Sequence, residues 1–117
     1  MKPGVEAGVA ELINRYIELA KLHGLAASEF DHKKANRVHS RVMKVYRELQ
    51  ARWPEARSEF LELLDHPDLS VRCWAASQSL DSAPERAEAV LSEIAAKGPL
   101  HLKLSADATL MRLRLER

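Results

Sequence analysis

Residues 67–80 decide the fold, and they read Pro67-Asp68-Leu69-Ser70-Val71-Arg72-Cys73-Trp74-Ala75-Ala76-Ser77-Gln78-Ser79-Leu80. Proline followed by aspartate is typical of a turn that starts a helix, because the aspartate side chain can accept hydrogen bonds from the first free amides of that helix. Ala75 and Ala76 then place small side chains together, and small side chains at a contact let a neighbouring helix come close. This stretch therefore predicts a closely packed helix.

Proline and glycine divide the rest of the chain into further segments with helical periodicity, and no segment alternates like a β-strand. We expect six helices. The first four span about residues 5–22, 28–52, 54–65 and 68–80. The fifth begins near residue 83, and the sixth spans about residues 99–115. Gly24 is predicted to end the first helix and Ser28 to cap the second. Pro54 is expected at the first position of the third helix. Ser82 and Glu85 have the spacing of a capping box, in which two side chains cap the start of a helix, and they precede the fifth helix.

Each predicted helix carries a stripe of apolar side chains that we expect to face the core. Cys73 is expected to be a small buried residue of the fourth helix, because the sequence shows no group that would activate its thiol. The predicted stripes are Val5, Val9, Leu12, Ile13, Tyr16 and Ala20; Ala35, Val38, Val42, Val45, Tyr46 and Leu49; Ala56, Phe60, Leu63 and Leu64; Ala87, Val90, Leu91 and Ile94; and Leu100, Leu104, Ala108, Met111 and Leu115.

Length and composition are those of one folded domain over residues 1–117. The hydrophobic fraction of 46% and the charged fraction of 30% argue against disorder, and the net charge of +1 gives no whole-molecule attraction to nucleic acid or membrane. One cysteine cannot form an internal disulfide, and no secretory signal or membrane-spanning run of about 18 apolar residues is evident. We therefore expect a cytoplasmic protein that does not enter a membrane.

Short connections predict that consecutive helices lie antiparallel and form three hairpins. Residues 1–53 would form an N-terminal hairpin that includes the long basic helix, and residues 54–117 two hairpins of roughly 30 residues, which is the size of one solenoid unit. The segments 71–76 and 102–108 both place small residues after an apolar and basic start. The predicted class is therefore all-α, with helical hairpins stacked in layers.

A resemblance to known proteins supports this architecture. From about Phe60 to the C-terminus the chain resembles HEAT-repeat proteins, and more closely a family of small bacterial HEAT-like proteins of unknown function. The matching segments are Val71-Arg72-Cys73-Trp74-Ala75-Ala76 with Leu80, Pro84-Glu85-Arg86-Ala87-Glu88-Ala89-Val90-Leu91, Leu104-Ser105-Ala106-Asp107-Ala108-Thr109-Leu110, and His32-Lys33-Lys34-Ala35-Asn36-Arg37.

This resemblance implies a HEAT-like α-α superhelix, an α-solenoid, that mediates protein–protein interaction. It brings no catalytic residue and no cofactor. Small bacterial helical-repeat proteins of this size often act as immunity proteins that neutralise toxins, and the analogy of fold and size makes an inhibitor-type adaptor one expected function.

The second predicted helix carries the most polarised surface of the chain. Basic residues outnumber acidic ones over residues 32–52, and Lys33, Arg37, Arg41, Lys44 and Arg47 share one side at about 100° per residue. This side is either a solvated face or a surface that docks an anionic partner, which could be an acidic protein or nucleic acid. Proteins that bind nucleic-acid strands usually place aromatic side chains among the basic ones, and this stripe lacks them.

Enzymatic and metal chemistry find little support in the sequence. Histidines do not occur in pairs four residues apart on a helix, so we expect no metal site. The four glycines are isolated, which argues against a phosphate-binding loop. Ser105 and Asp107 share a helix with His101 but point to different sides. We therefore expect a protein that is not an enzyme and needs no cofactor.

The expected function is that of a scaffold that binds another protein. The alternative is nucleic-acid binding through helix 32–52. A third candidate is self-association through the open end of the stack. In helical-repeat stacks the second helix of each hairpin lines the inner side, and here those helices are the second, fourth and sixth. The candidate contact residues are Lys33, Asn36, Arg37, Ser40, Arg41 and Lys44; Arg72, Trp74 and Gln78; and Lys103 and Asp107.

Overall fold

A computed structural model describes residues 8–116, which form six α-helices and one short 3-10 turn, with no β-strand in that range. The predictions of an all-helical chain and of six helices are confirmed. The elements are α1 (Val9–Ser28), α2 (His32–Gln50), α3 (Arg57–Leu61), the 3-10 turn η1 (Glu62–Asp65), α4 (Leu69–Gln78), α5 (Pro84–Lys97) and α6 (Leu100–Leu115). Val5, where the first helix was expected to begin, lies outside the described residues.

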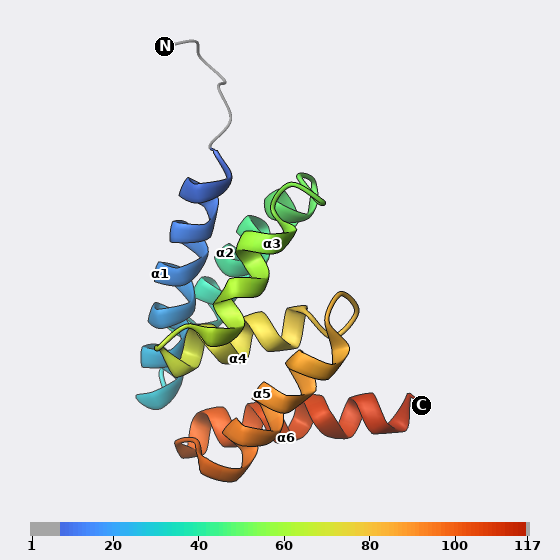
Figure 1. Cartoon of the computed structure of the whole chain (residues 1–117). Helices are drawn as coiled ribbons and strands as arrows, with labels where there is room; N and C mark the ends of the chain where they lie inside the picture. The colour runs from blue at the N-terminus through green and yellow to red at the C-terminus, as the bar shows by residue number, and fades with distance from the viewer. Residues whose placement is uncertain (1–7, 117) are drawn as a thin grey trace.

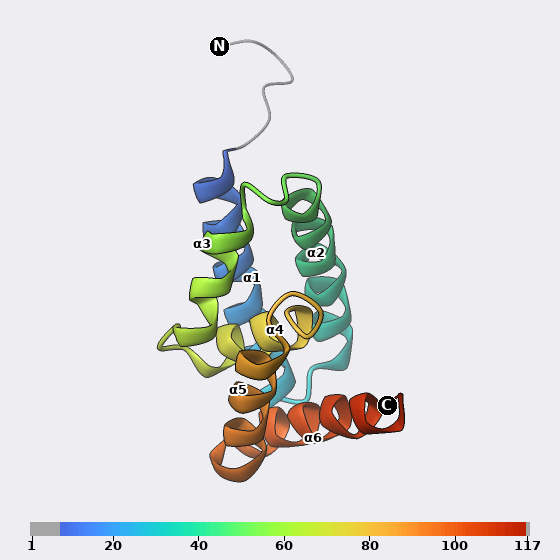
Figure 2. The same cartoon turned by 45° about the vertical axis from the view of Figure 1, so that its right-hand side comes forward.

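α4, the helix that lies within residues 67–80, is at the centre of the fold. It packs against α1, η1, α5 and α6. α1 and α2 form one antiparallel hairpin, α5 and α6 form another, and α6 runs across the end of the first hairpin at a steep angle (Figures 1 and 2). The predicted Asp68 start is confirmed, because the Asp68 carboxylate accepts a hydrogen bond of 3.1 Å from the Val71 amide.

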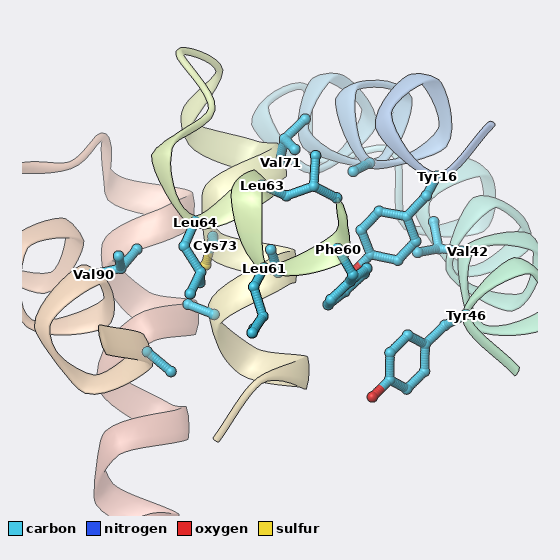
Figure 3. Close-up of a cluster of buried hydrophobic side chains, with 14 of the residues drawn as sticks. Tyr16, Val42, Tyr46, Phe60, Leu61, Leu63, Leu64, Val71, Cys73 and Val90 are labelled. Atoms are coloured by element: carbon cyan, nitrogen blue, oxygen red, sulfur yellow. The ribbon is translucent and has the colours of Figure 1, made fainter. Parts of the chain in front are cut away.

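Aromatic rings join the helices in one continuous core (Figure 3). Tyr16 and Phe60 are fully buried, with ring centroids 5.0 Å apart in an edge-to-face arrangement, and Tyr46 lies 5.5 Å from Phe60. The stripes predicted for the second, third and fifth helices are buried throughout, as are Leu12, Ile13, Tyr16, Ala20 and Cys73. The Tyr16 hydroxyl is buried and has no hydrogen-bond partner among residues 8–116.

The prediction that Gly24 ends the first helix is wrong, as is the prediction that Ser28 caps the second. α1 continues through Gly24 to Ser28, and the Ser28 hydroxyl donates to the Leu25 carbonyl at 2.7 Å. Asp31 caps α2 instead, because its carboxylate accepts a hydrogen bond of 3.1 Å from the Lys34 amide. Gly24 is buried against Ser70 of α4, where a Cβ atom would collide with the serine Oγ. Gly24 therefore allows α1 and α4 to pack closely, and it does not form a turn.

Gly24→Ala is therefore expected to destabilise the fold although it adds a better helix former. Overpacking of the α1–α4 contact costs about 1–3 kcal/mol, and the gain in helix propensity offsets about 1 kcal/mol. We therefore expect a net loss of up to about 2 kcal/mol in the free energy of unfolding. Urea denaturation checks this value. Adding Ser70→Ala removes the Oγ and should recover part of the loss, whereas strictly additive effects of the two changes would contradict the proposed collision.

The third predicted helix starts later than its sequence indicates. Pro54 does not open a helix: residues 51–56 form successive turns, and α3 begins at Arg57. Trp53 packs against Phe60 with ring centroids 5.8 Å apart, so tertiary contact holds the turn segment beside the core. The Arg57 guanidinium donates a hydrogen bond of 2.9 Å to the Ser82 carbonyl and links this turn to the start of α5.

The predicted capping box before the fifth helix is absent, because α5 begins after Ala83 and no side chain caps it. Pro84 does occupy the first turn of α5, as expected.

The apolar stripe predicted to bury α6 instead faces outward. Leu102, Ala106 and Leu110 face the core, whereas the predicted residues Leu100, Leu104, Met111 and Leu115 are 64%, 59%, 61% and 81% exposed, and Ala108 is exposed as well. α6 has apolar residues on two faces, so its periodicity could not identify the buried one. Packing against α5, α4 and α1 selects the Leu102 face.

Candidate functional site

A groove runs along α4 between α2 and α6. It consists of three adjoining hollows of about 390, 270 and 280 Å³, and Gln78 of α4 lines all three. α2 contributes His39, Met43, Tyr46 and Gln50, which recur about once per turn. α6 contributes His101, Ser105, Thr109 and Arg112, which recur in the same way. The predicted second, fourth and sixth helices thus line one concave surface.

Side chains of the groove floor are tied to the walls. Ala75 and Ala76 turn toward the core, which leaves Trp74 and Gln78 half-buried on the groove side of α4. The Gln78 amide donates to the Met43 sulfur at 3.1 Å, and the Gln78 backbone carbonyl accepts a hydrogen bond of 3.1 Å from the Tyr46 hydroxyl. These bonds fix the position of α2 relative to α4.

The largest of these three hollows, which we call the histidine pocket, brings His23 of α1, His39 of α2 and His101 of α6 around Trp74 of α4. The rings of His23 and His39 each lie 5.2 Å from the Trp74 ring and 6.0 Å from one another. Trp74 Nε1 donates a hydrogen bond of 3.3 Å to His23 Nδ1. Because Nδ1 accepts this bond, the proton of neutral His23 lies on Nε2.

Burial lowers the pKa of His23, and the neighbouring His39 and His101 lower it further. His23 is therefore neutral at neutral pH, as its hydrogen bond from Trp74 also requires. Burial raises the pKa of the Cys73 thiol, which favours the unreactive protonated form. His23 thus has a neutral resting state, and its charge can change in mildly acidic solution.

The lowered pKa of His23 predicts a loss of stability in mild acid. Well above pH ~6.5 His23 is neutral in both the folded and unfolded states, so there it has no effect on the pH dependence of stability. As the pH falls from about 6.5 toward the folded-state pKa, the unfolded chain binds more protons and the free energy of unfolding falls. Urea denaturation across this window should show the slope. His23→Gln should reduce it and the control His32→Gln should retain it, whereas equal slopes in all three proteins would contradict the assignment.

The structure places the predicted contact residues in several locations. Trp74 and Gln78 lie in the groove. Arg72 points the other way: its Nε donates to the Leu64 carbonyl at 3.3 Å, and its guanidinium lies 3.6 Å from the Glu93 carboxylate. Lys103 and Asp107 of α6 are exposed and do not line the hollows.

The α2 candidates Lys33, Asn36, Arg37, Ser40, Arg41 and Lys44 are all exposed. At about 100° per residue they occupy the sector of α2 beyond the line of His39, Met43 and Tyr46 that faces the groove. Asn36 and Ser40 lie nearest the groove rim. The basic residues form an outer face beside the groove rather than its wall.

Sequence reasoning missed the histidine pocket and Arg112. His23 and Trp74 are 51 residues apart, and no local spacing indicates that they meet. Arg112 lies in the last turns of α6, where its neighbours in sequence are Met111, Leu113 and another arginine. Only the crossing of α6 over the α1–α2 hairpin brings these groups together.

The part of the chain that the structure describes offers neither a metal-ion cluster nor a membrane span. It contains no group of three His, Cys, Asp or Glu side chains placed to hold a metal ion. None of its helices is long and apolar enough to cross a lipid bilayer.

Comparisons with known proteins identify a family and a fold. The family model described as "Domain of unknown function (DUF2019)" matches residues 10–114. A crystal structure of the protein RPA1889 from Rhodopseudomonas palustris CGA009 superimposes with a TM-score of 0.78 over 94% of this chain and 88% of that one, at 24% sequence identity. This likeness shows a shared fold. No curated protein matches the chain.

Proposed function

This chain belongs to the DUF2019 family, whose description assigns no activity, and we propose that it is a non-enzymatic scaffold that binds another protein in the groove between α2, α4 and α6. The observation that carries the proposal is the groove itself, whose floor and walls are held in register by Trp74, Gln78 and Tyr46. A concave surface of mixed apolar and polar character that is formed before binding is typical of a recognition site. Trp74 is of the residue type that most often anchors an interface.

The outer face of α6 supports a protein as the partner. Leu104 and Met111 are 59% and 61% exposed, and they lie on the face next to Ser105 and Arg112 of the groove wall. Exposed apolar side chains gathered on one surface are typical of interaction sites. We propose that the partner fills the groove and extends over this face.

We also propose that the chain is a short α-solenoid with HEAT-like geometry. Two antiparallel hairpins, α1–α2 and α5–α6, flank the central α4, which supports a layered arrangement (Figure 2). A scaffold of this kind binds by its concave side. An immunity-type inhibitor of another protein is one function that such a surface could serve.

Affinity capture with matched variants tests the proposal. Tagged wild-type protein is used as bait in lysate of the native cell, next to Ser77→Trp, which fills the groove, and Glu59→Ser, which changes an exposed residue of α3. Circular dichroism confirms that each bait is folded. We expect wild type and Glu59→Ser to retain the same protein and folded Ser77→Trp to lose it. Retention by all three baits, or by none, contradicts binding in the groove.

Nucleic acid is the second candidate partner, and α2 favours it. Lys33, Arg37, Arg41, Lys44 and Arg47 are exposed, and over residues 8–116 none of their side chains forms an ion pair. Contacts to phosphate would make the affinity for DNA or RNA fall steeply as salt rises. A mobility-shift assay should then show binding that Arg37→Ala with Arg41→Ala weakens. Absence of any shift at low salt removes this candidate.

Self-association is the third candidate function, and the exposed apolar face of α6 favours it. Light scattering measures the molar mass of wild type and of Leu104→Ser with Met111→Ser. If the wild type is a dimer and the double variant is a monomer, a second copy of the chain covers this face. If both proteins are monomers, self-association through this face is ruled out.

A further inference from the structure

We propose that the histidine pocket is an anion-binding site that takes a carboxylate side chain of the protein partner. That the carboxylate belongs to a protein partner rests on the scaffold function proposed above. That the pocket binds an anion does not rest on it. The inference comes from the set of groups that α1, α2, α4 and α6 bring together in one hollow of about 390 Å³.

The pocket gathers positive charge and hydrogen-bond donors without any acidic group. Its lining includes Arg112 and three imidazoles but neither aspartate nor glutamate. Among residues 8–116 no hydrogen bond or ion pair engages the Arg112 guanidinium. A guanidinium at the edge of a half-enclosed hollow is suited to bind an oxyanion with two parallel hydrogen bonds.

Neutral donors complement this charge. Because His23 Nδ1 accepts from Trp74, His23 presents its Nε2 hydrogen as a donor. Three hydroxyl groups also line the hollow, those of Ser70, Ser77 and Ser105. The pocket can therefore satisfy several lone pairs of a bound oxyanion while His23 remains neutral.

A carboxylate on an apolar stem fits the pocket better than a phosphate. Met43, Trp74 and Leu102 supply an apolar surface beside the polar groups, which the methylene groups of a glutamate side chain would contact. Arg112 is the one permanent charge in the lining, and its guanidinium can form two parallel hydrogen bonds with one carboxylate group. The basic outer face of α2, next to the groove, would favour further acidic residues of the same partner.

Mild acid should strengthen this binding. Protonation of His23 adds positive charge to the pocket, and a bound anion would in turn raise the pKa of His23. The groups that face His23 are His39 from α2, Trp74 and Cys73 from α4, and His101 and Arg112 from α6. Arg112 also lines the adjoining hollow, which contains the acidic residues Asp81 and Glu116.

Titration with glutarate tests the anion site without any partner. Histidine NMR signals and tryptophan fluorescence of the full chain are followed as sodium glutarate is added at constant ionic strength. We expect saturable binding, with an affinity on the order of tenfold higher at about pH 6 than at about pH 8, and a higher pKa of His23 in the complex. Arg112→Gln should weaken binding about tenfold or more, whereas Arg114→Gln, an equal loss of charge on an exposed residue of the same helix, should not.

Three outcomes would overturn the proposal. These are no saturable response to glutarate, an equal loss of affinity in both arginine variants, and tighter binding of inorganic phosphate than of glutarate. Failure here is distinct from failure of the scaffold function. Capture of a partner by wild type but not Ser77→Trp, without a response to glutarate, would leave the scaffold standing and remove the carboxylate site.

Discussion

Phe60→Ala is expected to lower the free energy of unfolding by about 3–5 kcal/mol, which is the usual loss for a buried aromatic side chain. Phe60 is fully buried and lies among three other rings: Tyr16 at 5.0 Å, Tyr46 at 5.5 Å and Trp53 at 5.8 Å between centroids. These rings come from α1, α2 and the turn before α3. Truncation would open a cavity where the three segments meet, and a small domain has little stability in reserve.

Urea denaturation followed by circular dichroism measures this loss. Tyr16→Phe is the matched control, because it keeps the neighbouring ring and removes only a buried hydroxyl that has no partner in the described structure. We expect the control to be neutral or slightly stabilising, since an unpaired buried polar group is unfavourable. A loss below about 1 kcal/mol for Phe60→Ala would show that the ring is not the centre of the core.

Trp74→Ala is expected to lower the free energy of unfolding by about 2–4 kcal/mol, somewhat less than for a fully buried tryptophan because Trp74 is half-buried. The Trp74 ring contacts the Tyr16 ring edge-to-face at 6.5 Å and both His23 and His39 at 5.2 Å. It therefore joins α1, α2 and α4. The change should also distort the histidine pocket.

Trp74→Phe separates packing from hydrogen bonding. It keeps most of the aromatic surface but removes the Nε1 hydrogen that stabilises neutral His23. We expect a smaller loss of stability, about 1 kcal/mol, and a rise in the pKa of His23 toward its ordinary value. Urea denaturation and histidine NMR titration measure the two effects. An unchanged or lower His23 pKa in folded Trp74→Phe would contradict the role of this hydrogen bond.

Local periodicity was sufficient to identify the helices and most of the core. The α2 stripe, from Ala35 to Leu49, was predicted residue by residue, because its opposite face is strongly charged and only one orientation buries apolar surface without burying charge. The start of α4 was equally clear, because an aspartate before a helix caps it with its own side chain.

Local signals misled where the neighbours of a residue come from elsewhere in the chain. Gly24 is typical of a helix end in its sequence context. In the structure it lies inside α1 and leaves room for Ser70, which is 46 positions later in the chain. The candidate site shows the same division. Trp74 and Gln78 were found because they lie on a recognisable helix, whereas His23, His39 and Arg112 became one pocket only in the folded chain.

The sequence by itself determined the six helices and the close packing of α4. It also determined the buried face of each helix that has a single apolar stripe. These features follow from the sequence because hydrophobic periodicity and capping act over a few residues. Tertiary structure alone decided which of the two apolar faces of α6 is buried, and that the histidines of α1, α2 and α6 meet at Trp74. Both depend on how helices cross, which is set by side chains from distant segments packing together.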